Sequence, residues 1–400
     1  MDKKLSLLLT FFLCGILLTM LFTGCITEEQ KPEKSKETVL PEAQLDQPSV
    51  LPDWSDGEYH DYSGTMEMLN GFNDKYPGLV DVFSIGKSVL GKDIWCMRLT
   101  NEKNDEIKSS CLIDGCSHGN EWEGGEACLY LAEYLLINFD TNSTTTQILN
   151  SSEVYIIPLI NPDGRQENTR WNENGIDLCR NFDIDFGRMR GYVFPLGKLF
   201  GRIKIPALPL DWSRDFILLH KWFPSFPLFF TNCGRRPFSE PESQAMRDFM
   251  RELENKDFSF YVNCHTASHN IDNPWGAFKP PFEISKQEQY IFNYAGGWVA
   301  ENTEYLYEKT TYKGTDYKAS GSIEDWCFKE FRIPSFCFEI LSWDYEPGFL
   351  PGKHDHLVHW METTLPVFMY LLVNINNLHE WRTPDIQPPL PEGVPPETLQ

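Results

Sequence analysis

Four short apolar runs, each followed closely by a polar residue, constrain the fold of this chain most strongly. The runs span residues 110–114, 154–160, 258–263 and 335–338. Helical patterns separate them, and this alternation is typical of a parallel sheet with helices on both faces. The polar residues that follow the runs are His118, Asn161, His265 and Glu339. Because ligands bind outside the carboxyl ends of the strands in such sheets, we expect one crevice that collects these four side chains.

The first run leads into a candidate metal site. It breaks at Gly115, offers His118 and Glu121 three residues apart, and continues as a helical pattern over residues 127–136. An imidazole and a carboxylate at this spacing, on the turn that leaves a strand, can face one small cation. Zinc would need a third ligand from elsewhere and would keep a fourth position for water. Taken alone, the motif leaves open a surface turn in which the two side chains merely hydrogen-bond.

The charge of the chain argues against a nucleic-acid partner. Its 400 residues include 35 Lys and Arg but 58 Asp and Glu, which gives a formal net charge of -23. Such a chain has no basic face to displace phosphate counterions. Hydrophobic residues make up 41% of the sequence, which is enough for a large core. The sequence leaves the oligomeric state open.

The N-terminal segment, residues 1–25, is typical of an export signal. Two lysines precede an apolar run over residues 5–21, and the segment ends in Thr23-Gly24-Cys25. This ending resembles a lipobox, in which Cys25 is lipidated, and an uncleaved anchor is the alternative. Both interpretations place the chain on the extracellular face of the membrane, tethered at its N-terminus. Because one acyl chain anchors a protein only marginally, we expect a second chain or a second contact.

Three further segments differ in composition from the rest. Residues 26–56 are rich in Glu, Lys, Pro and Gln and are predicted to form a disordered tether, and residues 384–400 form a proline-rich tail. The remaining domain, residues 57–383, contains an apolar and basic insertion at 188–230. This insertion is either a packing flap over the sheet or a contact with the membrane surface.

Cysteine is abundant, with 11 in the chain. Removing one with the signal and assigning Cys25 to lipid leaves nine, an odd number that implies at least one unpaired thiol. Cys116, Cys179 and Cys264 lie beside the candidate site residues. Because no Cys-x-x-Cys pair is present, we expect these cysteines to be buried small hydrophobes or disulfide partners rather than thiolate ligands.

Further motifs follow in order along the chain. They are Asn161-Pro162-Asp163-Gly164 and the segments 175–182, 237–242, 317–321 and 336–339. Together with residues 114–122, this series resembles the zinc metallocarboxypeptidases, the carboxypeptidase A/B-like family, over residues 59–373. The resemblance implies a single α/β domain of the phosphorylase/hydrolase-like fold, with a mixed, mostly parallel sheet and helices on both faces. It also implies a hydrolase that removes C-terminal residues from peptide substrates.

Carried over residue by residue, the resemblance implies that His118, Glu121 and His265 bind one zinc ion. Asp177 matches the carboxylate that orients the first histidine, and Glu339 matches the general base. A carboxylate of pKa ~4.3 lies about 11 units below bulk water at ~15.7, whereas zinc lowers the pKa of a bound water to about 7. The metal and the glutamate are therefore both needed to deprotonate the attacking water.

The remaining matches concern the substrate. Arg170 corresponds to the arginine that stabilises the oxyanion, Arg180 to the arginine that clamps the terminal carboxylate, and Tyr317 to the tyrosine that closes over it. The family usually has Asn before the clamping arginine, whereas this chain has Cys179, so the clamp loses an amide donor. Glu324 falls where the family sets side-chain specificity, and an acidic residue there implies a preference for Lys or Arg.

Two other functions remain open. A related zinc amidohydrolase that acts on cell-wall peptides or N-acyl amino acids would use the same metal core, and altered carboxylate recognition around Cys179 would favour it. The other is a catalytically silent binding module on the same fold. The presence of all three ligand residues and of Glu339 argues against that module.

Overall fold

The computed structural model describes residues 50–54, 57–187, 233–307, 319–340 and 356–380. The predicted signal segment with Cys25, the insertion at 188–230, Tyr317 and the tail at 384–400 lie outside the described residues. The strands are β1 (Val80–Lys87), β2 (Asp93–Leu99), β3 (Ser109–Gly115), β4 (Ser152–Ile157), β5 (Phe258–His265), β6 (Asn270–Asp272), β7 (Leu306–Tyr307) and β8 (Ser335–Glu339). The helices are α2 (Tyr62–Lys75), α3 (Trp122–Ile137), α4 (Ser143–Ser151), α5 (Pro162–Glu167), η1 (Leu178–Arg180), α8 (Pro241–Leu253), η2 (Glu254–Lys256), α9 (Lys286–Asn302), α10 (Ile323–Phe331), α11 (Leu357–Val373) and α12 (Ile375–Glu380).

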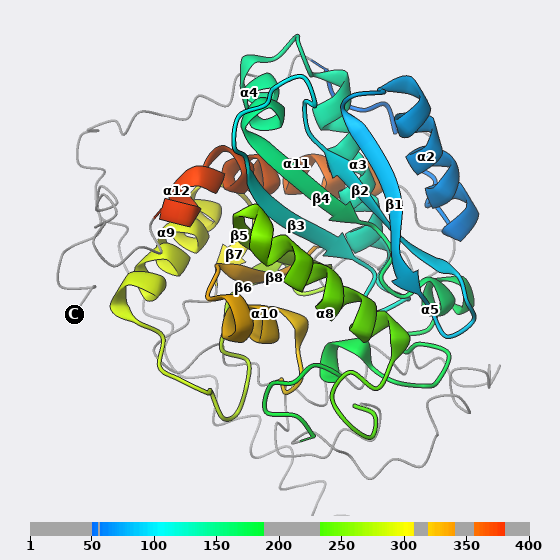
Figure 1. The fold of residues 1–400 in the computed structure, drawn as a ribbon, viewed down its shortest axis with the longest axis vertical. Helices are drawn as coiled ribbons and strands as arrows, with labels where there is room; N and C mark the ends of the chain where they lie inside the picture. The colour runs from blue at the N-terminus through cyan, green and yellow to red at the C-terminus, as the bar shows by residue number, and fades with distance from the viewer. Residues whose placement is uncertain (1–49, 55–56, 188–232, 308–318, 341–355, 381–400) are drawn as a thin grey trace, which may run out of the picture. The chain divides into compact units, whose positions relative to one another are not determined.

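The described strands form one sheet in the order β1-β2-β4-β3-β5-β8-β6-β7 (Figure 1). The four predicted apolar runs correspond to its centre, where β4, β3, β5 and β8 are neighbours and all parallel. Antiparallel pairs flank this centre, with β2 beside β4 and β6 beside β8. The predicted mixed sheet is therefore confirmed. Both β3 and β5 are buried along their whole length, as expected for strands covered on both faces.

Helices cover both faces of the sheet. In Figure 1, α8 crosses in front of the strands and α3 and α11 lie behind them. The buried residues of α8 include Met246, Phe249, Met250 and Leu253, which follow the i, i+3, i+4, i+7 spacing of one helix face. On the other side, α3 packs against β3 and β5. This helix is hydrophobic almost all round, because α11 covers the side that faces away from the sheet.

The folded domain begins earlier than predicted. Residues 50–54 belong to the segment expected to be a disordered tether, yet they pack against α3. The Trp54 indole nitrogen donates a hydrogen bond to Glu133 at 2.8 Å, and the Asn138 amide donates to the carbonyl of Val50 at 2.8 Å. The composition of the segment does not reveal this packing, because a single buried tryptophan anchors it and no periodic apolar pattern is present.

Helix α8 also begins differently from the prediction. The sequence Ser239-Glu240-Pro241-Glu242 predicts a capping box that opens the helix at Ser239. The N-cap residue is instead Glu240, which makes no side-chain capping bond. The Ser239 hydroxyl instead donates to the Glu240 carboxylate at 2.7 Å. The capping box lies at the start of α9, where Ser285 and Glu288 satisfy each other's backbone amides.

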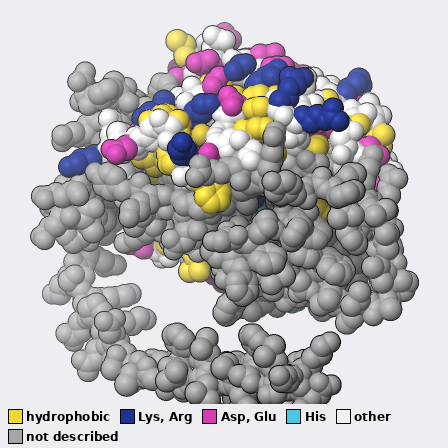
Figure 2. Space-filling model, turned by 90° about the horizontal axis from the view of Figure 1, so that it is seen from below, with side chains coloured by type: hydrophobic (Ala, Val, Ile, Leu, Met, Phe, Trp, Pro, Cys, Tyr) yellow, Lys and Arg dark blue, Asp and Glu magenta, His cyan; other side chains and the backbone are white. Residues whose placement is uncertain are grey.

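The surface of the described residues carries both signs of charge. Seen from below, Lys and Arg side chains lie among Asp and Glu side chains and apolar ones (Figure 2). Within the described ranges, no helix combines the length and the apolar character needed to cross a membrane. The nine described cysteines are all free, and eight of them are buried.

Two glycines test the close packing of α3 on the sheet. A methyl group on Gly124 would lie 2.5 Å from the carbonyl oxygen of Cys264 in β5, whereas one on Gly71 in α2 would meet nothing within 4 Å. We expect Gly124→Ala to lower the free energy of unfolding by about 1–3 kcal/mol through overpacking. Gly71→Ala should raise the free energy of unfolding by up to about 1 kcal/mol through helix propensity. Urea denaturation measures both, and a stabilised Gly124→Ala variant would contradict the packing described.

Candidate metal centre

The carboxyl ends of β3 and β5 bring the two predicted histidine ligands together. Gly115 pairs with Cys264 in the parallel register, so His265 at the end of β5 lies beside the turn that carries His118. Gly115 also lets α3 return close to the strand, because a side chain there would meet the backbone of Gly124 at 2.4 Å. This return places Glu121, the N-cap residue of α3, at the same point.

The carboxylate of Glu121 bridges the two imidazoles. Its Oε1 atom lies 2.7 Å from Nδ1 of His118, and its Oε2 atom lies 2.7 Å from Nδ1 of His265. The backbone amide of Thr266 also donates to Oε2 at 3.2 Å. His118, Glu121 and His265 are each only 4% exposed. The structure thus brings together the three residues predicted to bind the metal.

The charges of this cluster depend strongly on one another. Burial raises the pKa of Glu121, but the two imidazoles outweigh burial and hold that pKa well below its usual range. Burial and Arg170 lower the pKa of His118, whereas Glu121, Cys179 and Asp177 raise it, to about 10. Cys179 and Glu121 likewise raise the pKa of His265, although burial, which has the largest effect, lowers it. Without a metal ion, the ionised Glu121 therefore favours protonated, positively charged imidazoles on His118 and His265.

Asp177 and Arg170 surround the first histidine. The Asp177 carboxylate lies 3.1 Å from Nε2 of His118, on the opposite side of the ring from Glu121. The Arg170 guanidinium donates to Asp177 at 2.9 Å and to Glu121 at 3.2 Å. Burial raises the pKa of Asp177, but Arg170 and His118 bring it well below its ordinary value. An ionised Asp177 fixes the ring with Nδ1 directed at Glu121.

This donor set fits a zinc ion. Two imidazole Nδ1 atoms and one carboxylate converge, and zinc takes such nitrogen and oxygen ligands at about 2.0–2.2 Å. Metal binding requires neutral imidazoles, so an ion would replace the ring protons that now lie against Glu121. It would also supply the positive charge that the buried carboxylates favour.

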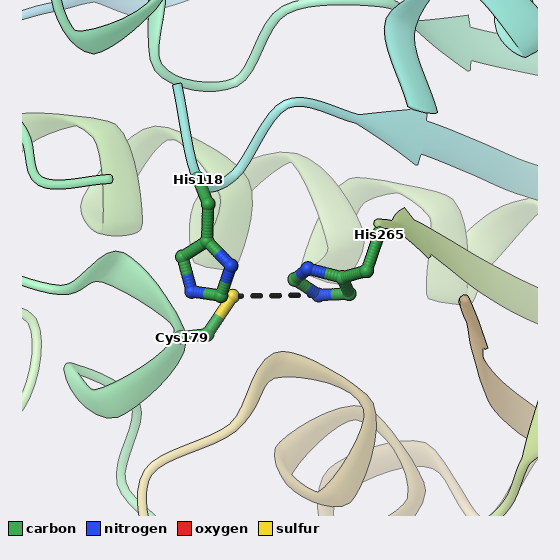
Figure 3. Close-up of side chains that lie close together, drawn as sticks. All are labelled: His118, Cys179 and His265. Carbon is green, nitrogen blue, oxygen red and sulfur yellow. Dashed lines mark hydrogen bonds between the residues drawn. The ribbon is translucent and has the colours of Figure 1, made fainter. Parts of the chain in front are cut away.

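Cys179 lies in this cluster and not only at the substrate clamp. Figure 3 shows its sulfur between His118 and His265, reached from the turn of η1. The sulfur lies 3.7 Å from Nε2 of His265 and 3.0 Å from the hydroxyl of Ser117. One potential ligand atom from each of His118, Cys179 and His265 lies within 4.8 Å of the others. The loss of an amide donor from the clamp stays a prediction, and the structure adds that the sulfur of Cys179 lies at the metal centre.

The protonation of Cys179 follows from its neighbours. Burial raises the pKa of this thiol, but the charges of His118 and His265 lower it, to about 6. This effect requires protonated rings. Since a metal ion on the Nδ1 atoms makes the rings neutral, we expect Cys179 to be a thiol when the ion is bound.

Glu339 and Arg180 border the same site. Glu339 ends β8 and pairs directly with His265 in the sheet. Burial raises the pKa of Glu339 to about 7, although His265 and His118 act to lower it. Arg180 is 4% exposed and donates to the carbonyl of Cys179 at 2.7 Å. Tyr317, its predicted partner in the clamp, lies outside the described residues.

Glu324 lies in the first turn of α10. Its Oε2 atom is buried and has no hydrogen-bond partner among the described residues. Glu324, Glu339 and Asp272 all raise the pKa of Cys337, after burial, which has the largest effect. Cys337 and Glu339 are two residues apart in β8 and so face the same side of the sheet. Glu324 is therefore close to Cys337, near the carboxyl end of β8.

A family model described as zinc carboxypeptidase matches residues 65–365. The chain belongs to the zinc carboxypeptidase family. Human carboxypeptidase A6 is 24% identical over 311 residues, which cover 73% of this chain and 62% of that protein. The chain thus spans less than two thirds of the length of that relative.

Similarity to solved structures shows that the chain has the zinc carboxypeptidase fold. Thrombin activatable fibrinolysis inhibitor superposes with a TM-score of 0.61 at 19% identity, covering 84% of this chain and 79% of that one. Carboxypeptidase A from Helicoverpa armigera gives 0.60 at 22% identity, covering 81% and 74%. The predicted family and fold are confirmed.

Several buried polar residues behind the metal centre were not predicted from the sequence. Asp114, Ser117, Tyr261 and Asn263 are hydrogen-bonded to one another, and each is completely buried. The available signal was periodicity, since Tyr261, Asn263 and His265 occupy alternate positions of an otherwise apolar strand.

Asp177 can be tested as the support of the metal centre. We expect Asp177→Asn to weaken zinc binding about 10–100-fold, because the ring of His118 loses the carboxylate that orients it. Competition with a chromogenic chelator measures the zinc dissociation constant. Asp163→Asn is a matched control, since Asp163 is equally buried but pairs with Lys92. Equal zinc affinities for both variants and the wild type would contradict the role of Asp177.

Proposed function

We propose that this protein is a zinc-dependent carboxypeptidase that hydrolyses the C-terminal peptide bond of peptides. The bridging of His118 and His265 by Glu121, with Glu339 on the adjacent strand, is the observation that carries the proposal. A metal site with few protein ligands keeps a position open for water, and a carboxylate beside it can move protons. Membership of the zinc carboxypeptidase family supports the same chemistry.

Bound zinc would polarise the scissile carbonyl and make a water molecule acidic at neutral pH. In the proposed mechanism, Glu339 accepts the proton of the attacking water and passes it to the leaving amine. A carboxylate whose pKa is raised by burial is a stronger base than an exposed one. Arg170 stabilises the negative charge that develops on the carbonyl oxygen. Arg180, with Tyr317, binds the terminal carboxylate of the substrate.

We further propose a preference for C-terminal Lys or Arg. Glu324 supports it, because a carboxylate with a buried and unpartnered oxygen gains from a cationic side chain. Asp272 adds negative charge beside Cys337, since the two residues are paired between the neighbouring strands β6 and β8. Both carboxylates lie near Cys337, whose pKa they raise together with burial.

A related amidohydrolase is the second candidate function. Cys179 favours it, because its sulfur is directed to His265 and does not replace the amide donor of the usual clamp. A weaker carboxylate clamp would be less selective for the terminal carboxylate of a peptide. Parallel assays with C-terminal Lys peptides, cell-wall peptides and N-acyl amino acids separate the two functions.

We propose that the protein acts on the extracellular face of the membrane. The export signal in residues 1–25 and the lipobox-like ending at Cys25 support this location. The insertion at 188–230 would supply a second membrane contact. These segments lie outside the described residues, so the proposal rests on the sequence.

Glu339→Gln tests the general base. We expect turnover of C-terminal Lys peptides to fall about 100–10,000-fold, while the bound zinc, measured by elemental analysis, is retained. In the wild type, kcat/KM should decrease as the pH falls through the pKa of Glu339, because only the ionised carboxylate accepts a proton. The midpoint should lie above the ordinary pKa of a glutamate, because burial raises the pKa of Glu339. An unchanged rate in Glu339→Gln would exclude this role.

Glu324→Gln tests the substrate preference. Loss of the negative charge should reduce kcat/KM for C-terminal Lys and Arg about 10–100-fold, consistent with a hydrogen bond to a charged group, and should spare C-terminal Leu. Glu330→Gln on the exposed side of the same helix is the control, because it changes the net charge equally. If both variants keep the wild-type ratio of Lys to Leu cleavage, Glu324 does not set the preference.

A further inference from the structure

A chain of buried polar side chains leads away from the metal centre on the side of His265. The Nε2 atom of His265 lies 3.7 Å from the sulfur of Cys179, which lies 3.0 Å from the Ser117 hydroxyl. Ser117 in turn bonds to the amide oxygen of Asn263 at 3.3 Å. The chain therefore starts on the ring nitrogen that faces away from Glu121.

The chain continues to a buried carboxylate. The Asn263 amide nitrogen donates to the hydroxyl of Tyr261 at 3.0 Å, and this hydroxyl donates to Asp114 at 2.8 Å. Asp114, Tyr261 and Asn263 are all fully buried. Solvent thus cannot replace these bonds, and a missing link would leave a buried polar group unpaired.

All the donors along the chain point in one direction. The amide nitrogen of Asn263 can only donate, so Tyr261 accepts from it and donates its own proton to Asp114. The amide oxygen of Asn263 can only accept, so Ser117 donates to it. The Ser117 hydroxyl then accepts from the thiol of Cys179, and the sulfur is left to accept from Nε2–H of His265. Hydrogen bonds aligned in this way polarise one another.

We propose that Cys179 is a positioning residue, which holds His265 with its proton on Nε2 and its Nδ1 lone pair directed at the metal. Asp177 serves His118 in the same way, but through a direct carboxylate contact. The second histidine has a thiol in that place, connected by a buried chain to Asp114. This inference rests on the zinc centre of the proposed function and is independent of which substrate is cleaved.

Cys179→Ala tests the proposal through zinc affinity. We expect the zinc dissociation constant, measured by chelator competition, to rise about 10–100-fold, as is usual when a partner of a ligating histidine is removed. Cys179→Ser should recover part of the loss, because a hydroxyl also accepts from Nε2–H. Cys111→Ala is the control, since this thiol of β3 is equally buried but takes no part in the chain. Thermal denaturation confirms that each variant is folded.

Tyr261→Phe tests whether the chain acts as a unit. It removes the hydroxyl that joins Asn263 to Asp114. We expect weaker zinc binding than in the wild type, and no additional loss when it is combined with Cys179→Ala. Fully additive losses would overturn the coupling.

Two other outcomes would overturn the positioning role. If Cys179→Ala binds zinc like the wild type but has a higher KM for peptides with a free carboxylate, Cys179 belongs to the substrate clamp. If the cobalt-substituted wild type shows thiolate-to-cobalt charge-transfer absorption that is lost in Cys179→Ala, the sulfur is a metal ligand. Both measurements remain informative if the protein proves to cleave another substrate.

Discussion

The carboxylate of Glu121 is the interaction on which the site depends. It lies 2.7 Å from one nitrogen of each imidazole, although the two rings come from different strands that are far apart in sequence. All three side chains are almost completely buried, where unpaired charges are costly. The shifts of their pKa values reflect this mutual dependence. A divalent ion at this point satisfies the carboxylate, and it allows both rings to be neutral.

The parallel strands at the centre of the sheet position the side chains of the metal centre. Four parallel strands end at one edge, and each is followed by a polar residue. This much could be predicted from the sequence, because strands buried on both faces appear as continuous apolar runs. The three candidate metal ligands, Asp177 and Glu339 could be predicted from ordered motifs. In the structure Asp177 lies on the far side of His118 from Glu121, and Glu339 lies beside His265.

Other features could not be predicted, for identifiable reasons. Cys179 was assigned to the clamp from its place beside Arg180, but the tight turn of η1 directs its sulfur to His265. The partners of Asp114 lie on a neighbouring strand, so no local pattern reveals them. Residues 50–54 and the start of α8 depend on tertiary contacts, of Trp54 with Glu133 and of Ser239 with Asn181, which outweigh composition and capping preference. The two histidines thus differ in the group that contacts Nε2, which is the Asp177 carboxylate for His118 and the Cys179 sulfur for His265.

X-ray absorption at the zinc edge of the purified, zinc-loaded protein tests the central claim most directly. We predict about one zinc ion per chain with a shell of nitrogen and oxygen at about 2.0–2.2 Å, including imidazole scattering from two histidines. A protein that binds no zinc would contradict it. A sulfur at about 2.3 Å in the shell would contradict it equally, because Cys179 would then bind the metal itself.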